Sequence, residues 1–257
     1  CNYQHRYEIR GRLIVPDVIG VMDGLAGQQM VRAGIPRRRL AIVGHPILEP
    51  SPEKKKRAMV RRCSPQASDG RRVLFLSEPI SWNGKLSPRV VRYSRHNEMT
   101  VLRNLLAVFE KNADLRAYSL HIRPHPLEPL SRLKTVLRQY APPDLRVTID
   151  RSRPLEKDLD SARVVLGITS IALLQALLAG RPVLSLHFAP ARGRIPDDIL
   201  CFLPRIRSRG SFIQAVSHFI RARRTNGKWH AAARWPRLPR HSSVRIAREI
   251  EKLLKRK

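Results

Sequence analysis

The chain has few aromatic residues, few cysteines and no long apolar run, and each shortage excludes a class of protein. Aromatic residues make up 5% of its 257 residues, which is too few for the base-stacking surfaces of RNA-recognition domains. Its three cysteines are widely spaced and odd in number, which fits reduced thiols better than a disulfide framework or a zinc cluster. The longest apolar run, around 171–179, is far short of the ~20 residues that span a bilayer. Because no signal-peptide pattern opens the chain, we expect a cytoplasmic protein.

Common nucleotide-binding and metal-binding motifs are also missing. The sequence contains no Walker P-loop, GxGxxG, zinc-finger or helix-turn-helix pattern. His121 and His125 have the spacing of a metal-binding pair on a helix, but Pro124 and Pro126 forbid that helix. We therefore expect no metal site and no bound cofactor.

Acidic residues are scarce, with 20 Asp and Glu against 50 Lys and Arg and a formal net charge of +30. Such a charge favours a polyanionic partner, either nucleic acid or an anionic membrane surface. The basic residues, mostly Arg, occur in many small groups rather than along one helix face. This distribution favours a solvated basic surface that retains anionic substrates or lipid headgroups, and leaves non-catalytic nucleic-acid or polyanion binding as the less favoured alternative.

Residues 1–48 are predicted to be the end of an N-terminal α/β domain, which the resemblance described below implies to be the acceptor-side domain. The apolar pattern predicts a strand over 13–21, a helix over 25–32 and a strand over 40–43. Such a unit cannot bury its own sheet, so we expect the chain to be N-terminally incomplete. Three further regions follow: a linker at 49–70, a second α/β domain at 71–225, and a basic tail at 226–257 that contains a helix over 244–255. This helix is predicted to pack on the missing domain or to lie on an anionic membrane.

Strands and helices alternate in the second domain. Strands are predicted at 73–76, 117–122 and 145–149, and helices at 98–111 and 130–140. This alternation predicts an α/β fold with a Rossmann-like, doubly wound parallel sheet. Ligands of such sheets bind beyond the carboxyl ends of the strands.

The most informative segment is 159–188, which has the form of a phosphate-binding strand–turn–helix–strand unit. A buried strand at 163–166 stops at Gly167, where we expect the backbone to turn freely, and a helix begins near Ile171 and closes at Gly180. The start of a helix beyond a strand presents free N–H groups and a positive dipole to an anion. A plain helix cap at Ser170, with no ligand, remains the alternative.

Several side chains are expected to meet at this edge of the sheet. Thr169 and Ser170 can hold a phosphate through N–H and hydroxyl groups, and Arg123 can neutralise its charge. His125 can donate to the phosphate or orient the nucleotide, and Glu78 can bind a sugar hydroxyl. The alternatives are structural: His125 as a rigid loop residue between two prolines, and Glu78 as the residue that ends a strand.

The order of these features resembles the GT-B glycosyltransferases of capsule and surface-polysaccharide synthesis. The similar elements are Gly34-Ile35-Pro36, Gly44-His45-Pro46, Arg123-Pro124-His125-Pro126, Gly167-Ile168-Thr169-Ser170 and Ala179-Gly180-Arg181-Pro182-Val183. The His-Pro and Thr-Ser elements are similar to those with which bacterial sialyltransferases and CDP-glycerol glycerophosphotransferases hold a cytidine nucleotide. The resemblance implies that the chain is the C-terminal half of a GT-B fold with a remnant of the N-terminal domain.

The resemblance also implies partners and site residues. A nucleotide sugar or CDP-activated donor would bind with its nucleotide at His125 and Pro126. Its phosphate would lie at Gly167, Thr169 and Ser170. The acceptor would be a glycan or a lipid-linked glycan, reached at the inner membrane face.

Two departures from the family leave parts of the reaction open. Gln175 stands where many GT-B enzymes have a Glu for the donor's ribose or sugar, and His187 is a further candidate there. The catalytic base is unassigned, and Asp23 and Glu78 are the only weak candidates; Asp23 is favoured as a helix-start residue. A sugar-nucleotide 2-epimerase shares the fold and remains the alternative enzyme, although no pair of acid/base carboxylates is identified for it.

Overall fold

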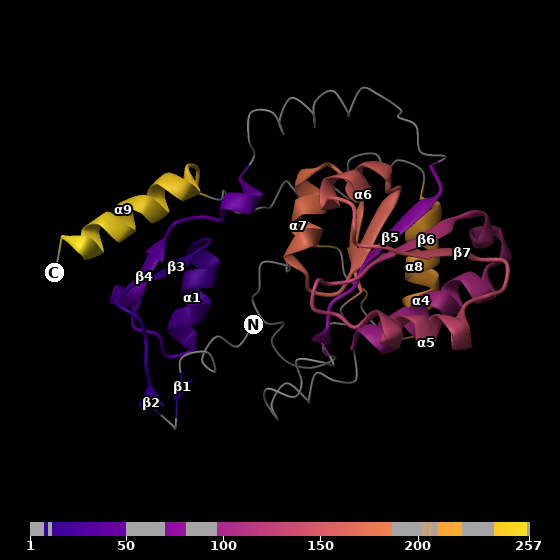
Figure 1. Ribbon diagram of the computed structural model, residues 1–257, viewed down its shortest axis with the longest axis horizontal. Helices are drawn as coiled ribbons and strands as arrows, with labels where there is room; N and C mark the ends of the chain where they lie inside the picture. The colour runs from indigo at the N-terminus through magenta and orange to yellow at the C-terminus, as the bar shows by residue number, and fades with distance from the viewer. Residues whose placement is uncertain are drawn as a thin grey trace. The chain divides into compact units, whose positions relative to one another are not determined.

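The computed structural model describes residues 8–9, 12–49, 70–80, 97–186, 203, 206, 210–222 and 239–255. These residues belong to two compact units. Unit 1 comprises the described residues up to 49 and from 239 onward, and unit 2 comprises the remainder. Figure 1 shows both units and labels most of their helices and strands.

Unit 1 contains two small sheets. In the first, β1 (Glu8–Ile9) pairs antiparallel with β2 (Arg12–Leu13), and in the second β3 (Ile19–Val21) pairs parallel with β4 (Leu40–Ile42). Short 3-10 helices, η2 (Arg37–Arg39) and η3 (Pro46–Leu48), flank β4. The single strand expected over 13–21 is therefore wrong. Pro16 lies between β2 and β3 and has no N–H to donate to a strand ladder.

Helix α1 (Gly24–Arg32) connects β3 to β4 and begins at a side-chain cap. Asp23 Oδ1 accepts from the backbone N–H of Ala26 at 2.7 Å. Met30 of α1 packs with Ile19 and Val21 of β3 in the small core of this unit.

Helix α9 (Ser242–Leu254) also belongs to unit 1 and matches the helix expected near the end of the chain. Its first turn is held by the carboxylate of Glu49, which accepts from the backbone N–H groups of His241 and Ser242. Farther along the helix the apolar side chains of Val244, Ile250 and Leu254 are exposed.

Unit 2 contains a five-stranded sheet in the order β7-β6-β5-β8-β9, and every neighbouring pair is parallel. The strands are β5 (Arg72–Leu76), β6 (Ser119–Arg123), β7 (Arg146–Ile149), β8 (Val164–Gly167) and β9 (Val183–Ser185). Strands β5 to β8 fall within or close to their expected ranges, because short apolar runs bounded by helices are typical of a buried parallel sheet. Strand β9 is the last strand of the strand–turn–helix–strand unit expected over 159–188. The α/β, Rossmann-like, doubly wound fold class is confirmed.

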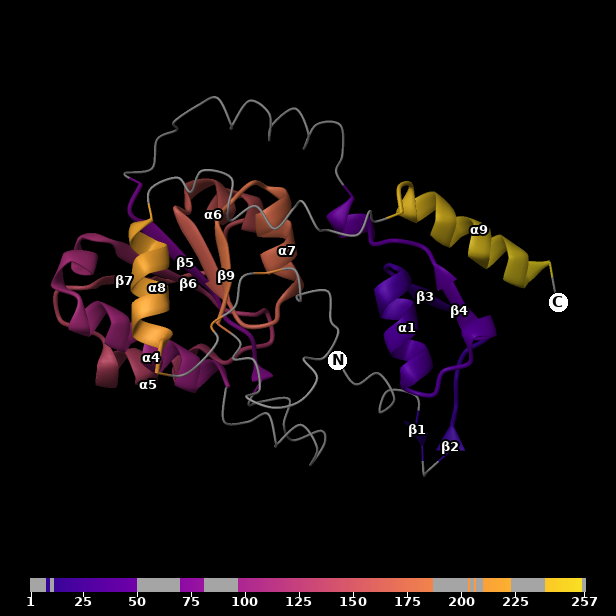
Figure 2. The same ribbon diagram turned by 180° about the vertical axis from the view of Figure 1, so that it is seen from behind.

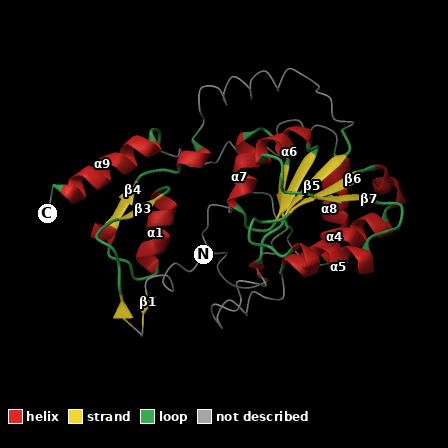
Figure 3. Cartoon of the chain, in the orientation of Figure 1, coloured by secondary structure: helices red, strands yellow, loops and turns green. Residues whose placement is uncertain are grey.

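Helices cover both faces of this sheet, as Figures 1 and 2 show from opposite sides. One face packs on α4 (Glu98–Lys111), α5 (Leu130–Tyr140) and α8 (Phe212–Arg221). The other face lies against α6 (Leu155–Ser161) and α7 (Ile171–Leu178). The 3-10 helix η6 (Ala113–Ala117) connects α4 to β6, and Figure 3 shows the strands between these two layers.

The core of unit 2 follows from strand alternation. Val73 and Phe75 of β5, with Leu120 and Ile122 of β6, face α4 and α8 and are fully buried. The residues between them, Leu74 and His121 among them, point to the other face of the sheet.

Helices α6 and α8 were not expected from the sequence. No helix within the described ranges has both the length and the apolar composition needed to cross a membrane.

Candidate functional site

The carboxyl ends of β5 and β8 mark the topological switch point of the sheet. From β5 the chain adds β6 and β7 on one side, and it then crosses over to add β8 and β9 on the other. In doubly wound sheets, the crevice beyond the carboxyl ends at such a point is where ligands bind. Ser77 and Glu78 follow β5 here, and Thr169 and Ser170 follow β8.

The turn after β8 leads directly into α7. Ser170 is the N-cap of α7, and its Oγ accepts from the backbone N–H of Ala172 at 3.2 Å. Ser170 is thus the helix cap that the sequence offered as the alternative, and phosphate binding at this turn stays a prediction. Gly180 ends the helix with a φ of +74°, a conformation that favours glycine.

Gly167 is required for a reason that the sequence did not indicate. It is not among the described glycines with positive φ, so the expected free turn of the backbone is wrong. A Cβ atom at this position would lie 2.8 Å from Leu173 Cδ2 and 3.2 Å from the carbonyl oxygen of Leu76. Glycine therefore allows β8, α7 and the end of β5 to approach one another closely.

Glu78 occupies the hydrogen-bond donors of this turn. Its Oε1 accepts from the backbone N–H of Thr169 at 2.6 Å, and its Oε2 accepts from Thr169 Oγ1 at 2.7 Å. Burial raises the pKa of the Glu78 carboxyl above its ordinary value, and the hydrogen bonds from Thr169 offset part of that rise. A carboxylate of the chain thus lies where the sequence predicts a phosphate, and Thr169 itself is exposed to solvent.

The turn after β6 is connected to the end of β5 by a second carboxylate. Glu128 is buried, and its Oε1 accepts from Ser77 Oγ at 2.8 Å. Its Oε2 accepts from the backbone N–H of His125 at 3.2 Å. Burial raises the pKa of Glu128, while the hydrogen bonds from Ser77 and His125 lower it. The adjacent residues Ser77 and Glu78 therefore join the two turns that contain His125 and Thr169.

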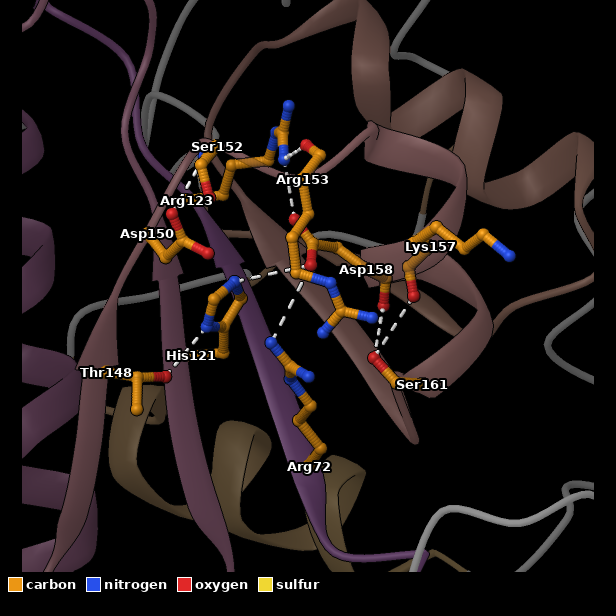
Figure 4. Close-up of polar contacts among 10 residues, drawn as sticks. All are labelled: Arg72, His121, Arg123, Thr148, Asp150, Ser152, Arg153, Lys157, Asp158 and Ser161. Atoms are coloured by element: carbon orange, nitrogen blue, oxygen red, sulfur yellow. Dashed lines mark hydrogen bonds and ion pairs between the residues drawn. The ribbon is translucent and has the colours of Figure 1, made fainter.

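Arg123 has a different partner from the predicted phosphate. Its Nη1 donates to Asp158 Oδ2 at 2.6 Å and to the carbonyl oxygen of Arg153 at 2.7 Å. Figure 4 shows Asp158, from α6, with Arg72, His121 and Arg123 around it. Since the Asp158 side chain is 1% exposed, Arg123 balances a buried charge, and a phosphate would have to compete with that carboxylate.

His121 belongs to the same buried cluster. Its Nδ1 lies 2.7 Å from Thr148 Oγ1, and its Nε2 lies 3.5 Å from Asp158 Oδ1. Burial lowers the pKa of His121, and the charge of Arg72 lowers it further. Among the described residues, no group of three or more His, Cys, Asp or Glu side chains has the arrangement of a metal site.

The remaining predicted residues lie at separate places. Asp23 caps α1 in unit 1 and is buried, which matches the favoured interpretation of it as a helix-start residue. Pro126 is exposed in the turn after β6, and Gln175 lies half-buried in α7. His187 is outside the described residues, so its role stays a prediction.

Two residues of this edge were missed by sequence reasoning, Glu128 and Arg151. Arg151 Nη1 donates to the carbonyl oxygens of His125 at 2.9 Å and Pro126 at 2.8 Å. A signal for Glu128 was present, because it lies two residues after Pro126 in a chain with only 20 acidic residues against 50 basic ones. Nothing in the sequence around Arg151 distinguished it from the many other arginines of the chain.

No protein-family model and no curated protein matches the sequence. Solved structures do match its fold. MnaA of S. aureus, in complex with UDP, aligns with a TM-score of 0.56 and 12% identity over 95% of this chain and 62% of that chain. The UDP-GlcNAc 2-epimerase of Methanocaldococcus jannaschii, in complex with UDP-GlcNAc and UDP, aligns with a TM-score of 0.50 and 15% identity over 85% of this chain and 59% of that chain.

A third structure, the wall teichoic acid polymerase TagF, aligns with a TM-score of 0.46 and 10% identity over 93% of this chain and 59% of that chain. This chain spans less than two thirds of the length of each of these three structures. At these identities the likeness concerns the fold. The chain has the α/β fold, with parallel sheets of the Rossmann type, that is found in GT-B proteins.

Proposed function

We propose that unit 2 binds the phosphates of a nucleotide-activated donor at the carboxyl ends of β5 and β8. The observation that supports this most strongly is the contact of Glu78 with the N–H and hydroxyl of Thr169 at the topological switch point. These donors already hold an anionic group of the chain. A phosphate offers the same kind of acceptor with more charge, so it can replace the carboxylate.

The enzyme we propose is a GT-B transferase that moves a sugar or a glycerophosphate-like group to a surface glycan acceptor. In such a reaction the leaving nucleotide phosphate gains charge, which the N–H groups at the start of α7 stabilise. His125 lies on the neighbouring turn, and its imidazole ring can supply a further donor. A base must also deprotonate the acceptor hydroxyl. No base is assigned, because Asp23 caps α1 and Glu78 accepts from Thr169 in the free protein.

A sugar-nucleotide 2-epimerase is the second candidate, supported by the fold likeness to the epimerase of Methanocaldococcus jannaschii. That reaction removes and returns a proton at the sugar, so it needs acid/base groups that face the sugar. The two carboxylates of this edge, Glu78 and Glu128, both accept hydrogen bonds from the chain itself. The same engagement leaves the transferase without an assigned base, so the contacts of Glu78 and Glu128 do not separate the two enzymes.

Calorimetric titration of UDP, CDP, CMP and GDP into the whole chain tests the binding proposal. The matched variant is Thr169→Ala/Ser170→Ala, which removes both hydroxyls of the turn. We expect one nucleotide to bind and the double variant to lose about 1.5–3 kcal/mol, the range for hydrogen bonds to a charged group. Weak, equal binding of all nucleotides that the variant leaves unchanged would favour a nonspecific basic surface, whose binding also collapses as salt rises.

Product analysis separates the two enzymes. Incubation with UDP-GlcNAc yields its C2 epimer without an acceptor if the chain is an epimerase. A transferase instead releases the nucleotide only when a glycan acceptor is present.

A further inference from the structure

Glu128 connects its own turn to Ser77, which lies 51 residues earlier in the sequence. Its carboxylate is buried at 3% exposure, and each oxygen has one donor. Oε1 accepts from the Ser77 hydroxyl at the end of β5, and Oε2 accepts from the backbone N–H of His125 at the start of the turn after β6. The turn is thereby fastened to the strand at the switch point.

The same turn is held internally and from its other side. The backbone N–H of Glu128 donates to the carbonyl oxygen of His125 at 2.9 Å. Arg151, which follows β7, donates to the carbonyl oxygens of His125 and Pro126. Hydrogen bonds from the neighbours on both sides therefore fix the backbone of residues 125–128.

This fixed backbone determines which nitrogen of His125 has the proton. The backbone N–H of Leu127 donates to His125 Nδ1 at 3.2 Å. A ring nitrogen that accepts a hydrogen bond has no proton of its own, so in the neutral ring Nε2 is protonated. Phosphate oxygens accept hydrogen bonds, so this tautomer can donate to them, whereas the other would present a lone pair.

We propose that Glu128 is a positioning residue of the nucleotide site, which holds the turn against Ser77 and so keeps His125 in the tautomer whose Nε2–H donates to the ligand's phosphate. The phosphate part of the proposal rests on the proposed function. The tautomer is a property of the free protein and can be tested without a ligand.

The first test is ¹⁵N NMR of the histidine rings in the whole chain, with His125→Asn identifying the His125 signals. Glu128→Gln keeps both contacts, because its amide oxygen accepts from His125 N–H and its amide nitrogen donates to Ser77 Oγ. We expect wild type and Glu128→Gln to show the Nε2–H tautomer and Glu128→Ala to show a mixture. If Glu128→Ala is poorly folded, Ser77→Ala, which removes one partner of the carboxylate, is expected to shift the ring in the same direction. An unchanged tautomer in the folded variants overturns the proposal.

The second test is the affinity for UDP and CDP. We expect Glu128→Ala to weaken binding about tenfold and Glu128→Gln by less than about threefold, corresponding to the loss or retention of roughly one hydrogen bond to a charged ligand. The control is Val216→Ala, which removes fully buried methyl groups from the core-facing side of α8 and lies outside the turn. If Val216→Ala weakens binding equally, general loss of stability explains the effect and the proposal is wrong. If wild type binds neither nucleotide, the proposed function fails, and the NMR result still decides whether Glu128 fixes the His125 ring.

Discussion

Replacement of Glu78 by alanine is expected to strengthen nucleotide binding. In the free protein the Glu78 carboxylate accepts from both the N–H and the hydroxyl of Thr169, at 2.6 and 2.7 Å. A phosphate that binds at this turn must first displace the carboxylate. Removal of the carboxylate therefore removes a competitor that is always present.

The size of the effect follows from these two contacts. Hydrogen bonds to a charged group contribute about 1.5–3 kcal/mol each when well buried. Thr169 is exposed to solvent, so screening reduces the sum, and we take about 1.4 kcal/mol, which is tenfold in affinity. Glu78→Gln keeps both contacts in neutral form, so we expect a smaller gain of roughly threefold.

The pH dependence of binding gives an independent readout. Because burial raises the pKa of Glu78, the carboxyl takes up a proton at a higher pH than usual. A protonated carboxyl holds the Thr169 donors less strongly. The affinity of wild type for UDP should thus rise as the pH falls towards the pKa of Glu78, and Glu78→Gln should lack this component. The titration of UDP itself is common to both proteins and cancels in their ratio.

Calorimetry of UDP binding to wild type, Glu78→Ala and Glu78→Gln provides the measurement. Glu110→Gln removes the same charge from an exposed position of α4 and controls for net charge. Weaker binding by Glu78→Ala would refute the displacement and support the original interpretation, in which Glu78 binds a sugar hydroxyl.

Three predictions concern stability and are measured by urea unfolding followed by circular dichroism. Asp158→Asn leaves Arg123 without its buried counter-charge and should lower the free energy of unfolding by about 3 kcal/mol; a loss under about 1 kcal/mol would contradict the role given to this pair. Gly167→Ala forces a Cβ against Leu173 and should cost about 1–3 kcal/mol, and an unchanged midpoint would show that the turn can relax. Because the pKa of Glu128 is raised in the folded protein, the stabilisation of the fold by its protonated carboxyl is complete below the ordinary pKa of 4.5. This stabilisation is lost as the pH rises through the raised pKa. Glu128→Gln should therefore gain stability relative to wild type as the pH rises above 4.5, and a constant difference would be evidence against the shift.

Most helices and strands of unit 2, with the exception of α6 and α8, were predictable because they have a local signal. Helix α5 was expected over 130–140, which are its observed bounds, since its apolar spacing is helical. Helix α6 has only seven residues, which is too short for a clear period, and it was missed. The prediction of a single strand over 13–21 was wrong because it continued the strand across Pro16, which interrupts the strand ladder.

The sequence by itself determined the order of strands and helices, the cap at Ser170 and the presence of parallel strands whose carboxyl ends share an edge. Local periodicity, short apolar runs and turn residues were sufficient for these features. Only the tertiary structure decided which polar groups meet at that edge. Glu78 lies 91 residues from Thr169, and Ser77 lies 51 from Glu128; each pair meets because β5 lies between β6 and β8 in the sheet. Arg123 was assigned to a phosphate from its type alone, whereas the fold places the buried carboxylate of Asp158 beside it, and a buried charge requires a partner.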